Sequence, residues 1–453
     1  MNVLYLCSDE HNPALMGDHP VVNTPHMDRL RDESLNCTKA YVASPVCAPT
    51  RQSWLTGLHA AEHGQLGNQY AFDTRIPTVV ESFKGAGYRT ACLGKLHTWA
   101  PEVDGMMGFD RILNENSGDA WKEVRQTWRI SRETPEFDTD DAKLFAAMPF
   151  GERFSGRVRP DVGSCSSWLL AQEARTELQT AGDKPFFLYV GFRLPHYPFD
   201  LPRDWYYRFD PAEMPGAFGP DSAASPGTRF QARKRGWDKL TAEHHRLLQA
   251  RYYAAIEYTD HLVGEVLAEL DAQGLRENTL VIYTSDHGDM AGERGVWLKH
   301  TMFDASARKP LFLRMPGLRA GSFDHLISEV DVLKTVAGLV GVAHDHGSGR
   351  DLSAALLSGA EARTTAFAAD YLQEDGGVGM TMTRGRRFKL THYREPSFQQ
   401  TAVELFDMEQ DPAESHDLST DPLYKPVVDE LLHREQSWLD GLEQPEFPIA
   451  LRA

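Results

Sequence analysis

Three short apolar runs constrain the fold of this chain more than any other feature of its sequence. They span Val3–Cys7, Phe186–Phe192 and Leu280–Thr284, and helical stretches separate them along the 453 residues. Apolar runs of this length are typical of strands buried on both faces of a parallel sheet. The clearest helix runs from about Thr241 to Ala272, where apolar residues recur at intervals of three and four. This alternation predicts an α/β fold with helices on both faces of a sheet.

The pattern changes beyond about Arg363. Three alternating segments, at residues 367–371, 379–383 and 388–392, predict a small antiparallel sheet, and a helix is expected at about Pro422–Leu442. We therefore predict two domains, a large one over residues 1–362 and a smaller α+β one over residues 363–453. The tail at 443–453 contains two prolines and is expected to be extended. Because such a tail has little to pack on locally, we expect it to contact a neighbouring subunit of a homo-oligomer.

Two pairs of polar residues directly follow predicted strands. Asp9 and Glu10 come after the first apolar run, and Asp286 and His287 come after the third. In an open α/β sheet the ligand site lies at the carboxyl ends of the strands, so both pairs should point into one crevice. Carboxylate oxygens with one imidazole suit Ca²⁺, Mg²⁺ or Mn²⁺ better than a structural zinc ion. For an Asp-His pair taken alone, a solvated loop is the alternative interpretation.

The strongest local signal is the segment Ser44–Arg51, which contains Cys47 and Pro49. A turn set by Pro49 should lead into a helix, which places residue 47 near a positive helix end where an oxyanion is favoured. Arg51 lies one turn further on and can reach back with a fork of donors. The five cysteines are an odd number without zinc-like spacing, so no disulfide framework is expected. A buried structural cysteine is the alternative interpretation of Cys47.

This segment resembles the signature of type I sulfatases, in which a Cys-x-Pro-x-Arg core is read by a formylglycine-generating system and the cysteine is oxidised to an aldehyde. The resemblance spans about residues 2–312 and continues, in the family's order, through Asn23–Leu30, Gly94–His97, Leu194–Phe199, Ser285–Met290 and Gly295–His300. It implies an alkaline-phosphatase-like fold. In that fold a large mixed sheet is sandwiched by helices, and a smaller C-terminal domain carries an antiparallel sheet and a helix.

The resemblance also implies roles for individual residues. One divalent metal, Ca²⁺ before Mg²⁺ or Mn²⁺, would be held by Asp9, Cys47 as formylglycine, Asp286 and His287. Glu10 stands where many relatives carry a second Asp and others a Gln, so its role as a ligand stays open. The implied catalytic residues are Cys47, Arg51, Lys95, His97, His196 and Lys299.

In the implied mechanism, formylglycine at position 47 is hydrated to a geminal diol, and one of its oxygens attacks sulfur in line. Lys95, Lys299 and the metal would neutralise the sulfuryl oxygens. His196, with Lys299, would protonate or polarise the leaving oxygen. His97 would take a proton from the second hydroxyl, so that sulfate departs and the aldehyde returns. The chain would then be a sulfuric ester hydrolase, with the large domain as its catalytic part.

The substrate is less constrained than the reaction. The stretch Ser285–Gly295 with Trp297 looks most like choline sulfatase. Asn68 lies where that group has a substrate-facing asparagine, and Trp121 and Glu374 offer an aromatic face and a carboxylate for a quaternary ammonium group. Sulfated sugars and small aryl or alkyl sulfates stay open. So do two other functions, a phosphonate monoester or phosphodiester hydrolase of the same superfamily and a non-catalytic binder that keeps the fold.

The composition bears on the partners of this chain. A net charge of −18 disfavours nucleic acid, because neutralising phosphates needs a basic face. No apolar run approaches the roughly 20 residues of a membrane span. The N-terminus lacks the basic stretch and apolar region of a secretory signal, which predicts a cytoplasmic protein. The expected partners are a small sulfated substrate and the formylglycine-generating system.

Overall fold

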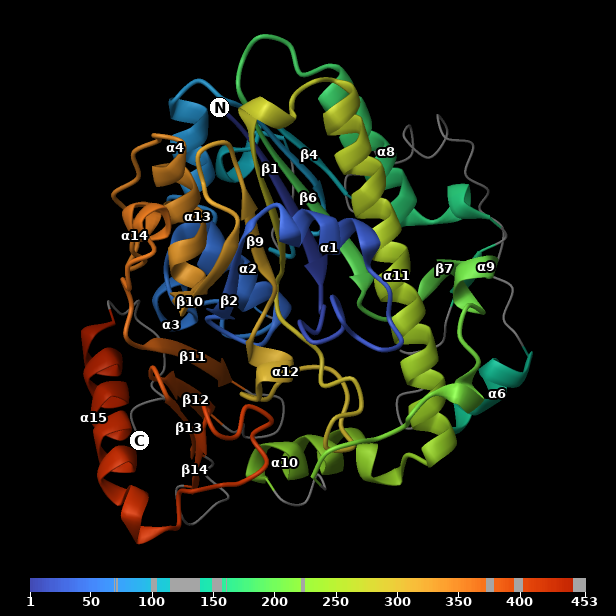
Figure 1. Ribbon diagram of the computed structural model, residues 1–453, viewed down its shortest axis with the longest axis vertical. Helices are drawn as coiled ribbons and strands as arrows, with labels where there is room; N and C mark the ends of the chain where they lie inside the picture. Colours follow the sequence, from blue (N-terminus) through green and yellow to red (C-terminus); the bar gives the residue numbers. More distant parts are fainter. Residues whose placement is uncertain are drawn as a thin grey trace.

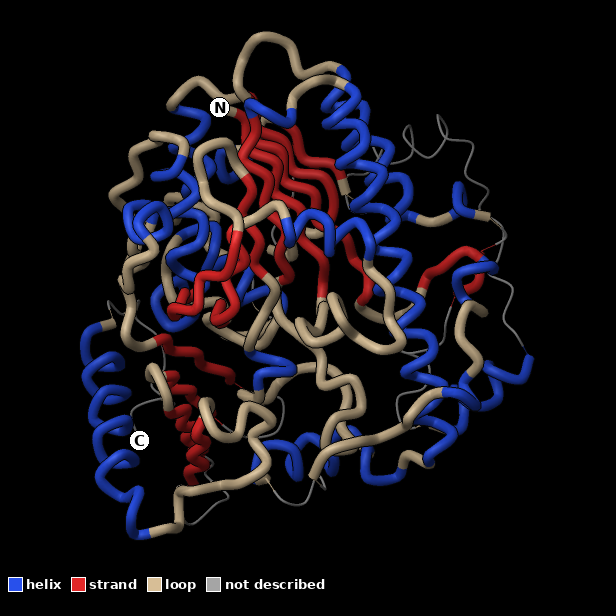
Figure 2. The backbone as a smooth tube through the Cα atoms, viewed as in Figure 1, coloured by secondary structure: helices blue, strands red, loops and turns tan. Residues whose placement is uncertain are grey.

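An eight-stranded sheet forms the centre of the molecule (Figures 1 and 2). The computed structural model describes residues 1–68, 70, 72–98, 104–114, 139–148, 157–159, 161–220, 225–371, 379–394 and 402–442. The strand order is β10 (Gly321–Ser328), β2 (Leu35–Tyr41), β9 (Leu311–Arg314), β8 (Thr279–Ser285), β1 (Asn2–Asp9), β6 (Phe186–Pro195), β3 (Arg89–Gly94) and β4 (Arg111–Leu113). β9 is antiparallel to both neighbours and the other pairs are parallel. The large mixed sheet is therefore confirmed.

The three apolar runs of the sequence become three adjacent strands. β1 lies between β6 and β8 and is parallel to both, with Leu4 opposite Leu188 on one side and Val281 on the other. Every residue of β1 is buried. Because neither face of this strand meets water, its sequence needs no polar alternation.

Helices cover both faces of this sheet. Leu4 and Leu6 share a core with α8 (Ser166–Gln179) and α11 (Ala242–Ala272). Their neighbours in β1 point the other way, into a core with α2 (Cys47–Thr56), α4 (Val79–Gly85) and α13 (Glu329–Leu339). Figure 1 shows α11 along one face and α2 and α13 on the other. The shorter helices are α1 (Pro25–Asp32), α3 (Ala60–His63), α6 (Thr139–Ala147), α9 (Arg203–Tyr206), α10 (Pro226–Arg235), α12 (Asp304–Ala307) and α14 (Ser353–Ser358).

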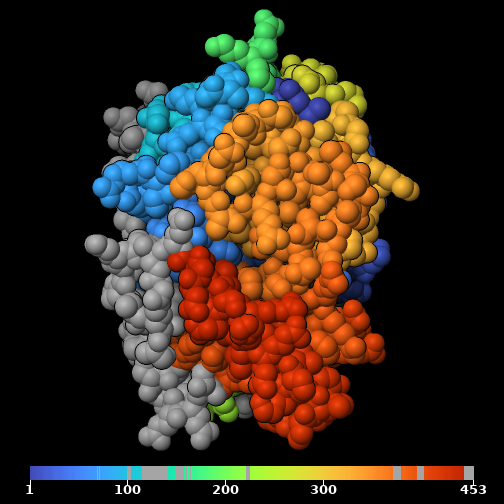
Figure 3. All heavy atoms as spheres, turned by 90° about the vertical axis from the view of Figure 1, so that its left-hand side faces the viewer, coloured from blue at the N-terminus to red at the C-terminus, as the bar shows by residue number. Residues whose placement is uncertain are grey.

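The C-terminal part forms a four-stranded antiparallel sheet with one long helix. Its strands follow the sequence: β11 (Ala366–Tyr371), β12 (Gly379–Arg384), β13 (Phe388–Arg394) and β14 (Ala402–Asp407). The helix α15 (Lys425–Gly441) packs on β12 and β13. In Figure 3 this part, in red, lies directly beneath the orange segment that carries α13 and α14.

The sequence pattern did not predict β14. Glu404, in the middle of this strand, is a charged residue that is only 3% exposed, and it breaks the expected apolar pattern. The fold provides it with partners, because the Ser225 hydroxyl donates to its carboxylate at 3.0 Å and the Tyr393 hydroxyl donates to the same oxygen. A hydrogen-bonded carboxylate can be buried where an isolated one could not.

Two further expectations concern a membrane span and the C-terminal tail. None of the helices in the described ranges combines the length and apolar character that a membrane span needs. The tail at 443–453, on which the expected subunit contact depends, lies outside the described residues.

Candidate active site

Four neighbouring strands of the central sheet end at one place with a polar side chain. Asp9 closes β1, Asp286 follows β8, Lys95 follows β3 and His196 follows β6. These strands lie side by side and are mutually parallel, so their carboxyl ends share one edge. The backbone N–H of His196 donates to the Asp9 carbonyl at 3.1 Å, which ties two of the strand ends together. The polar strand ends thus meet at one edge of the sheet, as the sequence analysis expected.

Cys47 is the first residue of α2 and is completely buried. Its Sγ lies 3.1 Å from His287 Nε2 and 3.7 Å from Asp9 Oδ1. The helix begins here because the Thr50 N–H donates to the Val46 carbonyl at 3.1 Å, which closes the first turn. Residue 47 therefore lies at the positive end of this helix, as the sequence predicts.

The charge around Cys47 acts strongly on its thiol. Burial raises the pKa, but Lys299, Lys95 and His287 outweigh burial and hold the pKa well below its usual value. His97 and His196 also form hydrogen-bond interactions with this side chain. Residue 47 therefore lies where an anionic oxygen would be stabilised from several directions.

Asp9, Cys47, Asp286 and His287 together offer ligand atoms that all lie within 4.8 Å of one another. The Nδ1 of His287 donates to the Gly288 carbonyl at 2.8 Å, which leaves Nε2 to face Cys47; against burial, Asp286 and Cys47 raise the pKa of His287 to about 9, so a bound metal would replace the proton on Nε2. Two carboxylates and an imidazole, with an oxygen at residue 47, form a donor set that fits Ca²⁺, Mg²⁺ or Mn²⁺. A second group, Asp9, Glu10 and His196, meets the same distance limit, so Glu10 lies beside the metal ligands.

The Arg51 guanidinium contacts the carboxylates of Asp9 and Asp286. Its Nε donates to one oxygen of Asp286 at 3.0 Å, and its Nη2 lies 2.9 Å from the same oxygen and 3.8 Å from Asp9. Its Nη1 donates to the Lys95 carbonyl and to the Tyr189 hydroxyl, both at 2.6 Å. Burial disfavours the charged guanidinium, yet Asp286 in particular keeps the pKa of Arg51 well above its usual value.

Tyr189 is a site residue that the sequence analysis missed. It lies inside the apolar strand β6, is fully buried, and its hydroxyl donates to the Lys95 carbonyl at 3.0 Å while it accepts from Arg51. The only signal in the sequence is a phenol within an otherwise apolar run. A buried hydroxyl must have a partner, which could have identified it as more than a packing residue.

Two lysines face the site from opposite sides. Lys95 makes an ion pair with Asp9. Lys299 Nζ lies 3.1 Å from Glu10 Oε2, and the same oxygen lies 3.3 Å from His196 Nε2. Burial opposes the charge on Lys299, but Cys47 and Glu10 keep the pKa of this lysine well above its usual value. Burial and Lys299 lower the pKa of His196 to about 4, so this imidazole is neutral at ordinary pH.

The loop between β8 and α12 brings Lys299 into the site. Asp289 holds its base, since its side chain accepts from the N–H of Ala291 at 2.6 Å and of Leu298 at 3.2 Å. Leu298 has a φ of 68° and His300 a φ of 67°, and this left-handed backbone turns the Lys299 side chain inward. Lys299 is consequently only 4% exposed.

Of the three predicted substrate residues, the structure describes only Asn68. The carbonyl oxygen of Asn68 accepts from the Ala48 N–H at 3.0 Å, so this side chain lies against the first turn of α2, next to residue 47. Trp121 and Glu374, predicted to bind a quaternary ammonium group, lie outside the described residues. Every predicted catalytic and metal-binding residue lies around these strand ends, in contact with at least one other member of the set.

Comparison with known proteins agrees with this geometry. A family model described as Sulfatase matches residues 1–342. The chain belongs to the sulfatase family. A second model, described as N-sulphoglucosamine sulphohydrolase, C-terminal, matches residues 292–439. With this membership the chain is a sulfuric ester hydrolase, as the sequence analysis predicted, and its fold is the alkaline-phosphatase-like one.

Individual relatives lie at moderate distance from this sulfatase. It is 28% identical to an ulvan-active sulfatase of Formosa agariphila, over 95% of this chain and 79% of that protein. It is also 28% identical to a choline-sulfatase of Rhizobium meliloti, over 93% of this chain and 83% of that protein. A phosphonate monoester hydrolase from Silicibacter pomeroyi has the same fold, with a TM-score of 0.79 at 22% identity over 98% of this chain and 96% of that one.

Proposed function

We propose that this sulfatase cleaves a sulfate monoester with formylglycine at position 47 and a divalent metal held by Asp9, Asp286 and His287. The observation that carries the proposal is the setting of Cys47, which is buried at the N-terminus of α2 and surrounded by the metal-side carboxylates and by cationic side chains. Hydrated formylglycine would supply an oxygen nucleophile and a second hydroxyl for releasing sulfate, and the metal would supply a Lewis acid.

The cations of the chain then stabilise the sulfuryl group. Lys95 and Lys299 both act on residue 47 and would neutralise the non-bridging oxygens, while Arg51 holds Asp286 in place. All three are held in place before substrate arrives, and preorganised charges in a buried site stabilise a transition state more than mobile ones do.

Proton transfer falls to two histidines and a lysine. The His196 Nδ1 donates to the Tyr197 carbonyl, so the neutral ring presents a lone pair at Nε2. Lys299 is therefore the ammonium donor to the leaving oxygen, and Glu10, whose Oε2 lies 3.1 Å from Lys299 Nζ and 3.3 Å from His196 Nε2, holds it in place. Burial and Lys95 lower the pKa of His97, which keeps this ring neutral and able to accept a proton from residue 47.

The substrate we propose is a small sulfate ester, with choline sulfate, aryl sulfates and sulfated sugars as the candidates. A phosphonate monoester is the second candidate, because the fold is shared with a phosphonate monoester hydrolase. The cytoplasmic location, the formylglycine-generating partner and the homo-oligomer stay predictions from the sequence.

One experiment tests the central claim. Active protein would be analysed by intact-mass and peptide mass spectrometry, and the same preparation would be assayed on choline sulfate, an aryl sulfate, sulfated monosaccharides and an aryl phosphonate. We expect an aldehyde at position 47 in active material and faster release of sulfate than of phosphonate. Unmodified cysteine at position 47 in fully active protein would overturn the nucleophile.

A further inference from the structure

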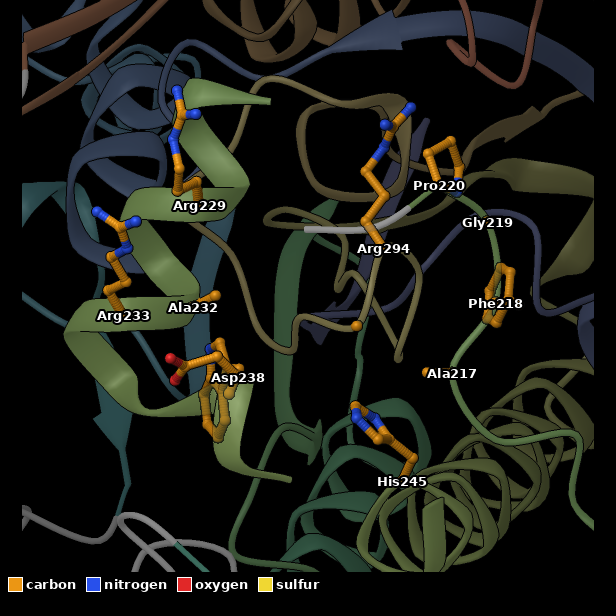
Figure 4. Close-up of a pocket in the computed structure, with 12 residues that line it drawn as sticks. Ala217, Phe218, Gly219, Pro220, Arg229, Ala232, Arg233, Asp238, His245 and Arg294 are labelled. Atoms are coloured by element: carbon orange, nitrogen blue, oxygen red, sulfur yellow. The ribbon is translucent and has the colours of Figure 1, made fainter. Parts of the chain in front are cut away.

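A second cavity lies beside the active site and has no role in the reaction described above. It has a volume of about 630 Å³, within the range of about 300–1,000 Å³ that is usual for small-molecule sites. Figure 4 shows Arg229 and Arg233 on one wall, Phe218 and Arg294 on the opposite wall, and His245 below.

The walls of this cavity are fixed by backbone hydrogen bonds. The Phe218 N–H donates to the Gly292 carbonyl at 3.3 Å, and the Arg294 N–H donates to the Phe218 carbonyl at 2.7 Å. The Gln249 side chain bonds to both segments of this wall. Its amide oxygen accepts from the Gly216 N–H, and its amide nitrogen donates to the carbonyls of Gly216 and, at 3.3 Å, Ala291. The wall that carries Phe218 and Arg294 is therefore formed before any ligand arrives.

The cavity is positively charged. Arg229 and Arg233 are one helical turn apart on α10, and neither guanidinium has an ion pair or hydrogen bond to another residue in the part of the chain that the structure describes. Asp238 is the one acidic residue among the lining residues. In a chain with a net charge of −18, two adjacent arginines without partners form a local site for an anion.

His245 adds a hydrogen-bond donor. Its Nδ1 lies 3.0 Å from Trp297 Nε1, and an indole N–H can only donate, so Nδ1 accepts and the imidazole proton is on Nε2. Burial lowers the pKa of His245 to about 4, which keeps the ring in this neutral form. The aromatic rings of Phe218 and Trp237 complete the lining with apolar surface.

The cavity and the active site share two elements. Helix α10 presents Arg229 and Arg233 to the cavity, while Gln231 on its other side donates to the His300 carbonyl at 3.3 Å. The loop that carries Arg294 into the cavity also carries Lys299 into the active site, and Trp297 between them holds His245. The cavity and the active site are therefore linked through α10 and through this loop.

We infer that this cavity binds an oxyanion, a sulfate or a carboxylate, that is attached to or accompanied by a ring with an apolar face. Arg229 and Arg233 match the oxygens, and the rings of Phe218 and Trp237 match the apolar face. The anion is either a second charged group on the sulfate ester, which rests on the proposed function, or a free anion, which does not. The kinetic and binding measurements below separate these two sources.

The test compares two charge-matched double variants. Arg229→Gln with Arg233→Gln removes the two cavity cations, and Lys184→Gln with Lys239→Gln removes two exposed cations outside the cavity. Each protein is assayed for sulfate release from 4-nitrophenyl sulfate, from a disulfated disaccharide and from the same disaccharide with one sulfate. Crystals of wild type and of the cavity variant are soaked in selenate, a sulfate isostere, and anomalous density is measured in the cavity. Thermal midpoints show whether each variant folds, and Arg233→Gln alone replaces the double variant if it does not.

We expect the cavity variant to raise the KM for the disulfated sugar by about tenfold, the value of roughly one charge-assisted hydrogen bond, with kcat unchanged. The aryl sulfate and the control variant should show no such change, because neither involves the cavity. Selenate density that the cavity variant loses, without a difference in KM, would identify a free anion as the occupant. No selenate density and no difference in KM would overturn the site. If wild type releases sulfate from none of the esters, the proposed function fails, whereas the selenate measurement still reports on the cavity.

Discussion

Replacing Tyr189 with phenylalanine would remove one buried oxygen on which two cations of the active site depend. The hydroxyl accepts from Arg51 at 2.6 Å and donates to the Lys95 carbonyl at 3.0 Å. Its ring packs between those of Tyr5 and Trp54, and phenylalanine would preserve both contacts. The change therefore isolates the hydrogen bonds from the packing.

The magnitude follows from these two bonds. The bond to the guanidinium contributes about 1.5–3 kcal/mol and the bond to the carbonyl about 0.5–1.5 kcal/mol. Arg51 Nη1 keeps its bond to the Lys95 carbonyl at 2.6 Å, but its second N–H loses its acceptor, so we expect a loss of at least about 2 kcal/mol. At about 2.1 cal/mol/K of unfolding entropy per residue, this loss lowers the thermal midpoint of the 453-residue chain by about 2 °C.

The effect on activity separates a positioning role from a structural one. We expect kcat/KM for an aryl sulfate to fall about tenfold in Tyr189→Phe, equivalent to about 1.4 kcal/mol of transition-state stabilisation. Tyr283→Phe is the matched control on the adjacent half of the sheet, because its equally buried hydroxyl also makes two hydrogen bonds, to Ser8 at 3.1 Å and to His11 at 2.7 Å. It should lose similar stability and little activity. Equal kcat/KM values for the two variants would refute the positioning role of Tyr189.

Three other predictions follow from the site and its surroundings. Cys47→Ala should abolish sulfate release while the thermal midpoint stays near that of wild type, and residual turnover above the uncatalysed rate would contradict the nucleophile assignment. Dialysis against EDTA should abolish activity and lower the free energy of unfolding by about 2.7 kcal/mol if the metal was present at a hundred times its Kd. Added Ca²⁺ should restore both. Undiminished turnover after dialysis would count against a metal. Burial, with Arg363, lowers the pKa of His59 to about 3. Below about pH 6.5 the unfolded chain therefore binds a proton that the folded chain does not, and the free energy of unfolding decreases as the pH is lowered. Between pH 6.5 and 5.0 wild type should therefore lose about 1.6 kcal/mol more than His59→Gln in urea titrations, and parallel losses would show that His59 is charged in the folded protein.

The strand ends of the site could be predicted because each is encoded locally. An apolar run followed at once by a carboxylate, as at Asp9 and Asp286, gives both the strand and the direction of its functional end. A proline one turn into α2 marks the start of the helix that carries Cys47. The family motif then assembles these local signals, because their order along the chain fixes which strand ends become neighbours.

What could not be predicted depends on contacts between distant residues. The pairing of Glu10 with Lys299 joins residues 289 positions apart, and the pairing of Tyr189 with Arg51 joins residues 138 apart. Neither separation follows the period of a helix or a strand, so neither pairing could be inferred from the sequence pattern. The left-handed backbone at Leu298 and His300 is equally hidden, because neither residue type favours it and only the surrounding loop contacts impose it.

The charge of the assembled site explains why sulfate esters suit it and why phosphonate monoesters stay a competing substrate. Arg51, Lys95 and Lys299 are each opposed by a carboxyl group, of Asp286, Asp9 and Glu10 respectively. The three pairs are neutral as a set when all six groups are ionised, although burial raises the pKa of Glu10 well above its usual value. A divalent metal would add two positive charges. A singly charged ester and one anionic oxygen at residue 47 would neutralise them.

Sulfate monoesters and phosphonate monoesters both carry one negative charge, so charge alone cannot separate them. A phosphate monoester is different, because with a second pKa near about 6 it carries close to two negative charges at neutral pH. It would leave an excess negative charge in a buried site, where uncompensated charge is costly. We therefore expect an aryl phosphate to be a much poorer substrate than an aryl sulfate of equal leaving group, with the aryl phosphonate between them. Efficient hydrolysis of the phosphate would mean that the site carries more positive charge than these three ion pairs and one metal provide.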